Sequence, residues 1–136
     1  MNKKYERPLG WTTIEESRRL VEAGLNPETA DMHYTLSEDE SYYILYADNE
    51  VAHDSIRIVP CWSLGALLRL MPEIHGERPK LDTSSISTDK YYVEYPYHER
   101  TKDVWYSTDL CSTPIWAACD MILWLLRNGF SEASHD

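Results

Sequence analysis

Apolar residues recur at helical spacing in three segments, and each segment follows a residue that favours a helix N-terminus. In the first segment, Thr13 and Glu16 have the spacing of a capping box, and Gly24 is suited to end the helix. In the second, Ser63 is the expected N-cap, and Pro72 follows the last apolar residue of the run. The pattern therefore predicts one helix after Thr13 and another after Ser63.

The third helical segment is the most hydrophobic part of the chain. Thr113 is its expected N-cap, Pro114 suits the first helical position, and Gly129 suits the position after the helix ends. The apolar stripe of this segment consists of Ile115, Ala118, Cys119, Ile122, Leu125 and Leu126. Because this stripe is wide, we expect the third helix to be the most buried of the three.

Two hairpins are predicted from aromatic and β-branched residues on either side of polar turns. The first joins His33–Leu36 to Tyr42–Ala47 through the polar loop Ser37–Ser41. The second joins Tyr91–Tyr97 to Asp103–Thr108. In both hairpins the two strands are expected to pair antiparallel, because short turns connect them.

The remaining segments carry weaker signals. Pro27–Met32 is predicted to form one short helical turn, and Ile56–Val59 a further short strand. Glu73–Asp89 has little periodicity and is predicted to be one long loop. Residues 1–8 and 131–136 are expected to be frayed.

The order of these elements favours an α+β fold, with a small, mainly antiparallel sheet and about three helices packed on one face. A chain of 136 residues with 43% hydrophobic residues is expected to form a single domain, residues 1–136. Its apolar runs are too short for a membrane span, and no apolar stretch follows the charged beginning. Three cysteines without CxxC spacing fit reduced thiols. We therefore expect a cytoplasmic protein.

Most of the net charge of -10 comes from one segment, residues 20–56, which holds nine acidic residues and no lysine or arginine. The chain has no basic patch for phosphates or an anionic membrane surface, so direct nucleic-acid and membrane binding are not expected. The acidic segment has three interpretations. It is a solvated face that keeps the protein soluble, a docking surface for a basic partner, or part of an acidic DNA mimic that opposes host defence.

No motif for a known chemistry is present. The sequence lacks GxxxxGK[ST], GxGxxG, HExxH and GxSxG, and the histidines have no spacing typical of a metal site. Cys61 precedes a predicted helix, a position that lowers a thiol pKa, but a buried cysteine beside Trp62 is the better interpretation. We therefore expect no catalytic residue, no metal and no cofactor, and this pattern favours a binding domain over an enzyme.

Five stretches of the chain carry a resemblance to a known family: Thr12–Glu15, Gly24–Met32, Pro60–Leu64, Thr113–Ile115 and Trp124–Gly129. Through them the chain resembles a family of small, uncharacterised proteins of gut Bacteroidetes that is associated with phages or mobile elements. Caps, helix ends and core positions make up these stretches. The resemblance implies a bacterial cytoplasm and a phage-linked accessory role, and it transfers no catalytic residue.

Tyrosine and tryptophan dominate the aromatic residues, with 10 Tyr and 5 Trp against 1 Phe. Both residue types are enriched at protein interfaces. We therefore predict that a Tyr-rich sheet face binds a protein partner or a second copy of the chain. The predicted contact residues are Tyr43, Tyr92, Tyr95 and Trp105, with Asp39 and Glu40 as a charged rim.

Two alternatives to this interface remain open. The first is a small enzyme or ligand-binding domain with a pocket near Asp31, His33 and Trp62. The second is the DNA mimic, which requires a continuous track of carboxylates. The sequence does not decide between these functions.

Overall fold

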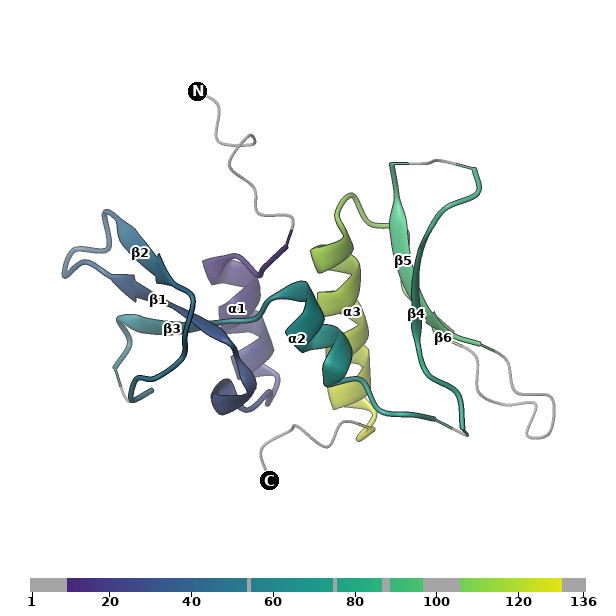
Figure 1. Ribbon diagram of the computed structural model, residues 1–136, viewed down its shortest axis with the longest axis horizontal. Helices are drawn as coiled ribbons and strands as arrows, with labels where there is room; N and C mark the ends of the chain where they lie inside the picture. Colours follow the sequence, from purple (N-terminus) through teal and green to yellow (C-terminus); the bar gives the residue numbers. More distant parts are fainter. Residues whose placement is uncertain (1–9, 54, 75, 87–88, 97–105, 131–136) are drawn as a thin grey trace.

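Three helices lie between two antiparallel sheets of three strands each (Figure 1). The computed structural model describes residues 10–53, 55–74, 76–86, 89–96 and 106–130. The predicted α+β class, with antiparallel pairing and three helices, is confirmed. The strands are divided between two sheets, each covered by helices on one face, whereas the sequence suggested a single sheet.

Each helix begins directly after the residue predicted to cap it. The helices are α1 (Ile14–Glu22), α2 (Leu64–Arg69) and α3 (Pro114–Arg127). The Thr13 hydroxyl accepts a hydrogen bond from the Glu16 N–H at 3.1 Å, and Glu16 Oε1 accepts one from the Thr13 N–H at 2.9 Å. These two bonds complete the predicted capping box. Gly24 follows α1 with a φ of 110°, a left-handed conformation that glycine adopts without strain.

The first sheet has the strand order β2-β1-β3. Its strands are β1 (Met32–Leu36), β2 (Tyr43–Tyr46) and β3 (Ile58–Cys61). β1 and β2 form the predicted first hairpin, and β3 is the predicted third strand, shifted to include Cys61. The predicted turn over Pro27–Met32 is shorter, because the 3₁₀-helix η2 (Pro27–Thr29) ends before β1 begins.

The second sheet has the strand order β4-β5-β6. Its strands are β4 (Lys80–Thr83), β5 (Tyr91–Tyr95) and β6 (Tyr106–Ser107). The prediction of one long loop over Glu73–Asp89 is therefore wrong. β4 has a single apolar residue, Leu81, which pairs with Val93, so it shows no periodicity of its own. The predicted frayed ends, and residues 97–105 of the second hairpin, lie outside the described residues.

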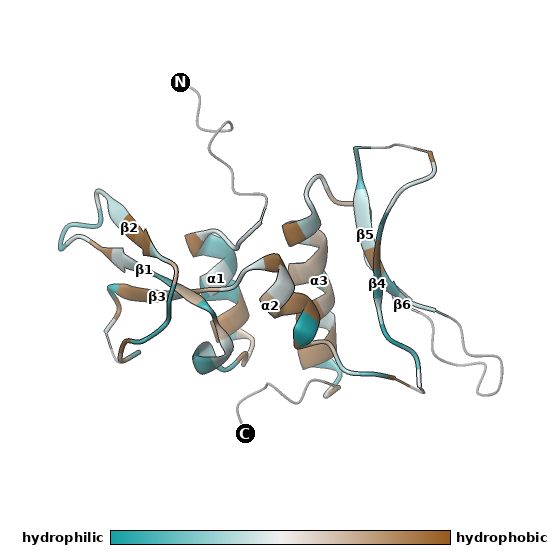
Figure 2. Cartoon of the chain, viewed as in Figure 1, coloured by the Kyte–Doolittle hydropathy of each residue, from teal (hydrophilic) through white to brown (hydrophobic). Residues whose placement is uncertain are grey.

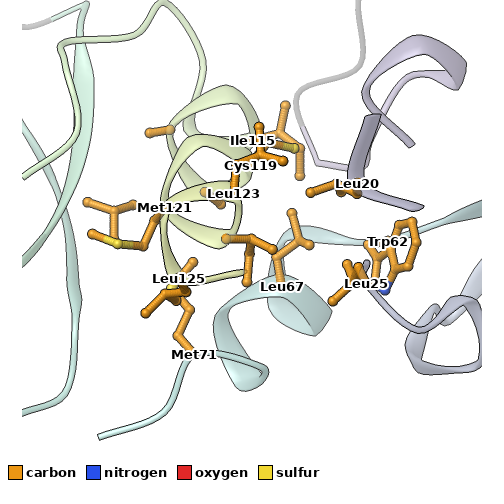
Figure 3. Close-up of a cluster of buried hydrophobic side chains, with 14 of the residues drawn as sticks. Leu20, Leu25, Trp62, Leu67, Met71, Ile115, Cys119, Met121, Leu123 and Leu125 are labelled. Atoms are coloured by element: carbon orange, nitrogen blue, oxygen red, sulfur yellow. The ribbon is translucent and has the colours of Figure 1, made fainter. Parts of the chain in front are cut away.

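The main core is built around α2 and α3, which Figure 2 shows as largely hydrophobic, and it extends to Leu20 of α1 and Val93 of β5. Figure 3 shows Leu67 of α2 and Met121 and Leu125 of α3 among the fully buried side chains of this core. A second, smaller cluster fills the space between the first sheet and α1; it contains Tyr34, Leu36, Val59 and Cys61. None of the helices in the described part of the chain has the length and apolarity of a membrane span.

Candidate functional site

The tyrosines predicted to share one sheet face are distributed over both sheets. Tyr43 lies in β2, whereas Tyr92 and Tyr95 lie in β5, on the opposite side of the helices (Figure 1). Trp105 lies outside the described residues. The predicted continuous Tyr-rich face is therefore not formed by Tyr43, Tyr92 and Tyr95.

Tyr95 is a core residue and not a contact residue. Its side chain is fully buried, and its hydroxyl donates a hydrogen bond to the Pro72 carbonyl oxygen at 2.6 Å. Burial raises the pKa of this phenol above its ordinary value. Tyr92 points to the other face of β5. Its neighbour on β4 is Asp82, and Glu94 lies two residues further along β5 on the same face. This outer face is polar, so Tyr92 gains no apolar surroundings there.

The largest group of exposed hydrophobic side chains in the first sheet lies on β2 and on Tyr42, the residue before it. The exposed fractions are 64% for Tyr42, 55% for Tyr43, 49% for Ile44 and 41% for Tyr46. Tyr43 lies edge-on to Tyr34 on the face toward α1, and Tyr46 stacks on the His33 ring on the other face at 4.7 Å. The prediction included Tyr43 but missed Tyr42, Ile44 and Tyr46. The run Tyr-Tyr-Ile-Leu-Tyr, without lysine or proline, was the signal for them.

β2 is also an edge strand with free backbone groups. The N–H of Ser37 donates to the carbonyl of Tyr42 at 3.0 Å, so Tyr42, Ile44 and Tyr46 face β1 in the alternating ladder. The N–H and C=O groups of Tyr43 and Leu45 consequently point away from the sheet. Among the residues that the structure describes, β2 pairs with β1 alone.

The opposite edge of the same sheet is closed. The Leu36 N–H donates a hydrogen bond to the Arg57 carbonyl oxygen at 2.8 Å. Because bonded positions alternate along the ladder, the backbone of Pro60 faces away from β1, and proline has no N–H to expose there. One position beyond the strand end, the Trp62 carbonyl accepts the Thr12 N–H at 3.0 Å. Proline and a covering segment are two ways in which natural proteins protect a sheet edge. Within the described ranges of the chain, neither protects β2.

Asp39 and Glu40 lie in the loop between β1 and β2, so the structure brings them together with Tyr43. The Asp39 carboxylate accepts hydrogen bonds from the hydroxyls of Ser41 and Ser37, at 2.8 and 2.9 Å. These bonds favour the ionised form and lower the pKa of Asp39 below its ordinary value. Glu40 lies 3.8 Å from Arg18, and both side chains are about half exposed. The predicted rim is therefore a charged loop at one end of β2.

The residues of the alternative pocket serve the fold. Asp31 accepts hydrogen bonds from the N–H and hydroxyl of Ser63. His33 is buried, and its Nδ1 lies 2.6 Å from the Asp48 carbonyl oxygen. Trp62 is fully buried, with its indole N–H donating to Thr29 at 3.0 Å. Each of these polar groups already has a partner inside the protein, and of the three residues Asp31 alone lines the hollow beside η2.

A hollow of about 700 Å³ does lie beside Asp31, between η2 and the segment after β2. Among the described residues, no hydrogen-bond partner exists for the buried Oδ1 of Asn49 or for either ring nitrogen of His53, which both line it. Within the same ranges, no group of three or more His, Cys, Asp and Glu side chains is placed to hold a metal ion. Two residues that line the hollow therefore carry buried polar atoms without a partner.

The three cysteines are buried and free. Burial raises the pKa of the Cys61 thiol to about 11 and of the Cys111 thiol to about 12, and it raises that of Cys119 well above the ordinary value. A protonated, inaccessible thiol is a poor nucleophile. These side chains act in packing, as expected for Cys61 from the sequence.

Comparison of the chain with protein-family models, with curated proteins and with solved structures found no match. The resemblance to the Bacteroidetes family therefore stays a prediction. The surface and interior geometry of this chain is the basis for any functional proposal.

Proposed function

We propose that this chain is a protein-interaction domain whose binding site is the open edge of β2. The observation that carries the proposal is an edge strand that, among the described residues, pairs on one side only. Four large side chains are exposed on this strand or directly before it: Tyr42, Tyr43, Ile44 and Tyr46. Unpaired N–H and C=O groups on a sheet edge are a template for adding a further strand. Tyrosine supplies large contact area with little loss of conformational freedom.

The contrast between the two edges of the first sheet supports this proposal. Pro60 and Thr12 close the edge at β3, whereas no described segment pairs with the outward backbone groups of Tyr43 and Leu45 at β2. An unprotected apolar edge is an aggregation hazard unless a partner covers it. The bacterial cytoplasm and the phage-linked accessory role that the resemblance implies belong to the same proposal, as the setting in which such a partner is found.

Site-specific photo-crosslinking in the bacterial cytoplasm tests the proposal. A benzophenone amino acid replaces Tyr43 in one variant and Tyr92, on the outer face of the second sheet, in the control. We expect a discrete adduct at position 43 and none at 92. The substitution Ile44→Lys should abolish the adduct, whereas Ile86→Lys, at a residue that is 93% exposed, should leave it unchanged. Equal labelling at positions 43 and 92, or no effect of Ile44→Lys, contradicts the proposal.

A second candidate function, small-molecule binding, is favoured by the hollow beside Asp31. It rests on the unsatisfied ring nitrogens of His53 and the Oδ1 of Asn49. A thermal-shift screen with small polar compounds tests it: a stabilising compound must lose its effect in His53→Ala. The DNA mimic has no comparable support, because Glu38 and Glu40 each lie 3.8 Å from an arginine.

A further inference from the structure

We infer that the partner of β2 is an extended segment that carries lysine or arginine, and not a second copy of this chain. This inference rests on the proposed function, because it names the chemistry of the strand that the β2 edge binds. Three features of the hairpin support it: the charge at both ends of β2, the register that a second copy would adopt, and the apolar strip between the charged ends.

Carboxylates stand at both ends of β2. Before the strand, the loop carries Glu38, Asp39 and Glu40, and after it come Asp48 and Glu50. All five residues are exposed. Two arginines face this group, since Arg57 lies 3.8 Å from Glu38 and Arg18 lies 3.8 Å from Glu40. Five carboxylates against two guanidinium groups leave a negative excess around the strand, and Figure 2 shows the loop before β2 as hydrophilic.

A second copy would place like charges together. If two β2 strands pair antiparallel through their outward-facing groups, Tyr43 of each lies opposite Leu45 of the other. In that register the acidic loop before β2 of each copy lies near the end of the other β2, where Asp48 and Glu50 follow the strand. A parallel pair is no better, because the acidic loops then lie side by side. Bringing like charges together is destabilising, so self-pairing is disfavoured at both ends.

A partner strand that carries lysine or arginine avoids this repulsion between like charges. Its apolar side chains cover the exposed strip of β2, Tyr43 on one face and Ile44 with Tyr46 on the other. Lysine or arginine near either end of the segment then lies beside the carboxylates of the hairpin. Because both ends of β2 are acidic, this complementarity does not depend on the direction in which the segment pairs. Complementary charge mainly raises the association rate and excludes wrong partners.

Fluorescently labelled synthetic peptides of about eight residues, the length of an ordinary strand, test the inference on the full chain. The first alternates valine with lysine, the second alternates valine with glutamate, and the third is the lysine peptide with alternate backbone nitrogens methylated. Binding is measured by fluorescence anisotropy at about 50 mM and at about 300 mM salt, because exposed charges are screened at the higher concentration. Sedimentation velocity of the chain alone measures self-association.

We expect the lysine peptide to bind at least about ten-fold more tightly than the glutamate peptide, with weaker binding at high salt. The variant Glu38→Gln/Asp39→Asn/Glu40→Gln should bind the lysine peptide about ten-fold more weakly. Its circular dichroism spectrum should show that the fold is intact. Methylation should abolish binding. Tyr43→Pro should bind more weakly than Tyr43→Ala, because only proline also removes the outward N–H at that position.

The failures of the two proposals are distinguishable. If both peptides bind equally and Tyr43→Pro weakens both, the edge binds strands and the basic partner is wrong. If the chain self-associates and Ile44→Lys makes it monomeric, the partner is a second copy and the inference is likewise overturned. If no peptide binds, the chain stays monomeric and no adduct forms at position 43, then the proposed function fails and the inference fails with it.

Discussion

The Asp31 carboxylate accepts two hydrogen bonds from Ser63, one from the backbone N–H at 2.9 Å and one from the hydroxyl at 2.6 Å. The same hydroxyl oxygen accepts the Ala66 N–H at 3.1 Å and so caps α2. Donation to a carboxylate polarises the hydroxyl and strengthens its bond to Ala66. The residue just before β1 thereby holds the start of α2.

This geometry predicts coupling between Asp31 and Ser63. Asp31→Ala should lower the free energy of unfolding by about 1.5–3 kcal/mol, the range for hydrogen bonds to a charged group. Ser63→Ala should lower it by about 1 kcal/mol through loss of the cap. The double variant should lose less than the sum, because both substitutions remove the same bond. Urea denaturation measures all three. Additive losses, or an equal loss in Glu22→Ala on the exposed face of α1, would contradict the coupling.

Replacing Gly24 and Gly65 with alanine should change the free energy of unfolding in opposite directions. Gly24 has a φ of 110°, so alanine there is strained, and we expect Gly24→Ala to destabilise the protein by about 1 kcal/mol or more. Gly65 lies in α2 without a positive φ, and an added Cβ would meet the flexible end of Arg69 at 3.4 Å and the Ser63 hydroxyl at 4.0 Å, an ordinary van der Waals distance. Gly65→Ala should therefore stabilise the protein by about 0.5–1 kcal/mol. Thermal unfolding of both variants gives the two signs, and a shared sign would refute the argument.

The buried thiols predict a loss of stability at alkaline pH. An unfolded cysteine ionises near pH 8.5, about its unperturbed pKa, whereas the pKa of folded Cys61 is about 11. Between these values the folded state holds a proton that the unfolded state has released. The free energy of unfolding therefore falls as pH rises, by at most about 1.4 kcal/mol per pH unit for each thiol. The urea midpoint should be lower at pH 10 than at pH 8, and the decrease should be smaller in Cys61→Ala.

Thiol labelling gives an independent check of the same burial. Cys61, Cys111 and Cys119 are 0%, 5% and 4% exposed. An aromatic disulfide reagent at pH 8 should therefore react slowly with the folded chain and should label all three thiols once the chain is unfolded in guanidinium. Rapid labelling of a thiol in the folded state would show that this thiol is exposed.

Packing between α2 and α3 should depend strongly on Leu67, which is fully buried in the main core (Figure 3). Leu67→Ala removes buried methyl groups and leaves a cavity, so we expect a loss of about 2–5 kcal/mol. Leu110 is the matched control, because it is 52% exposed, and Leu110→Ala should change stability by less than about 0.5 kcal/mol. Chemical denaturation measures both. Similar losses would mean that the assignment of the core is wrong.

Local interactions explain why the helices were predictable from the sequence. A cap such as Thr13 bonds within three residues of itself, and Gly24 ends α1 through its own backbone conformation. The first hairpin was predictable for the same reason, since β1 and β2 are joined by a short polar loop. In each case the partners are close along the chain, so the pattern of residues contains the interaction.

Long-range pairing decided the rest. β4 forms because Leu81 meets Val93, although nothing in residues 80–83 alone indicates a strand. Because the strands form two sheets, Tyr43 and Tyr92 lie in different sheets, and Tyr95 is buried in the main core. The starts of the helices, the first hairpin and the acidic loop beside it follow from residues that are neighbours along the chain. That β2 lies at the edge of its sheet follows only from the folded arrangement, because it depends on which strands pair with β1.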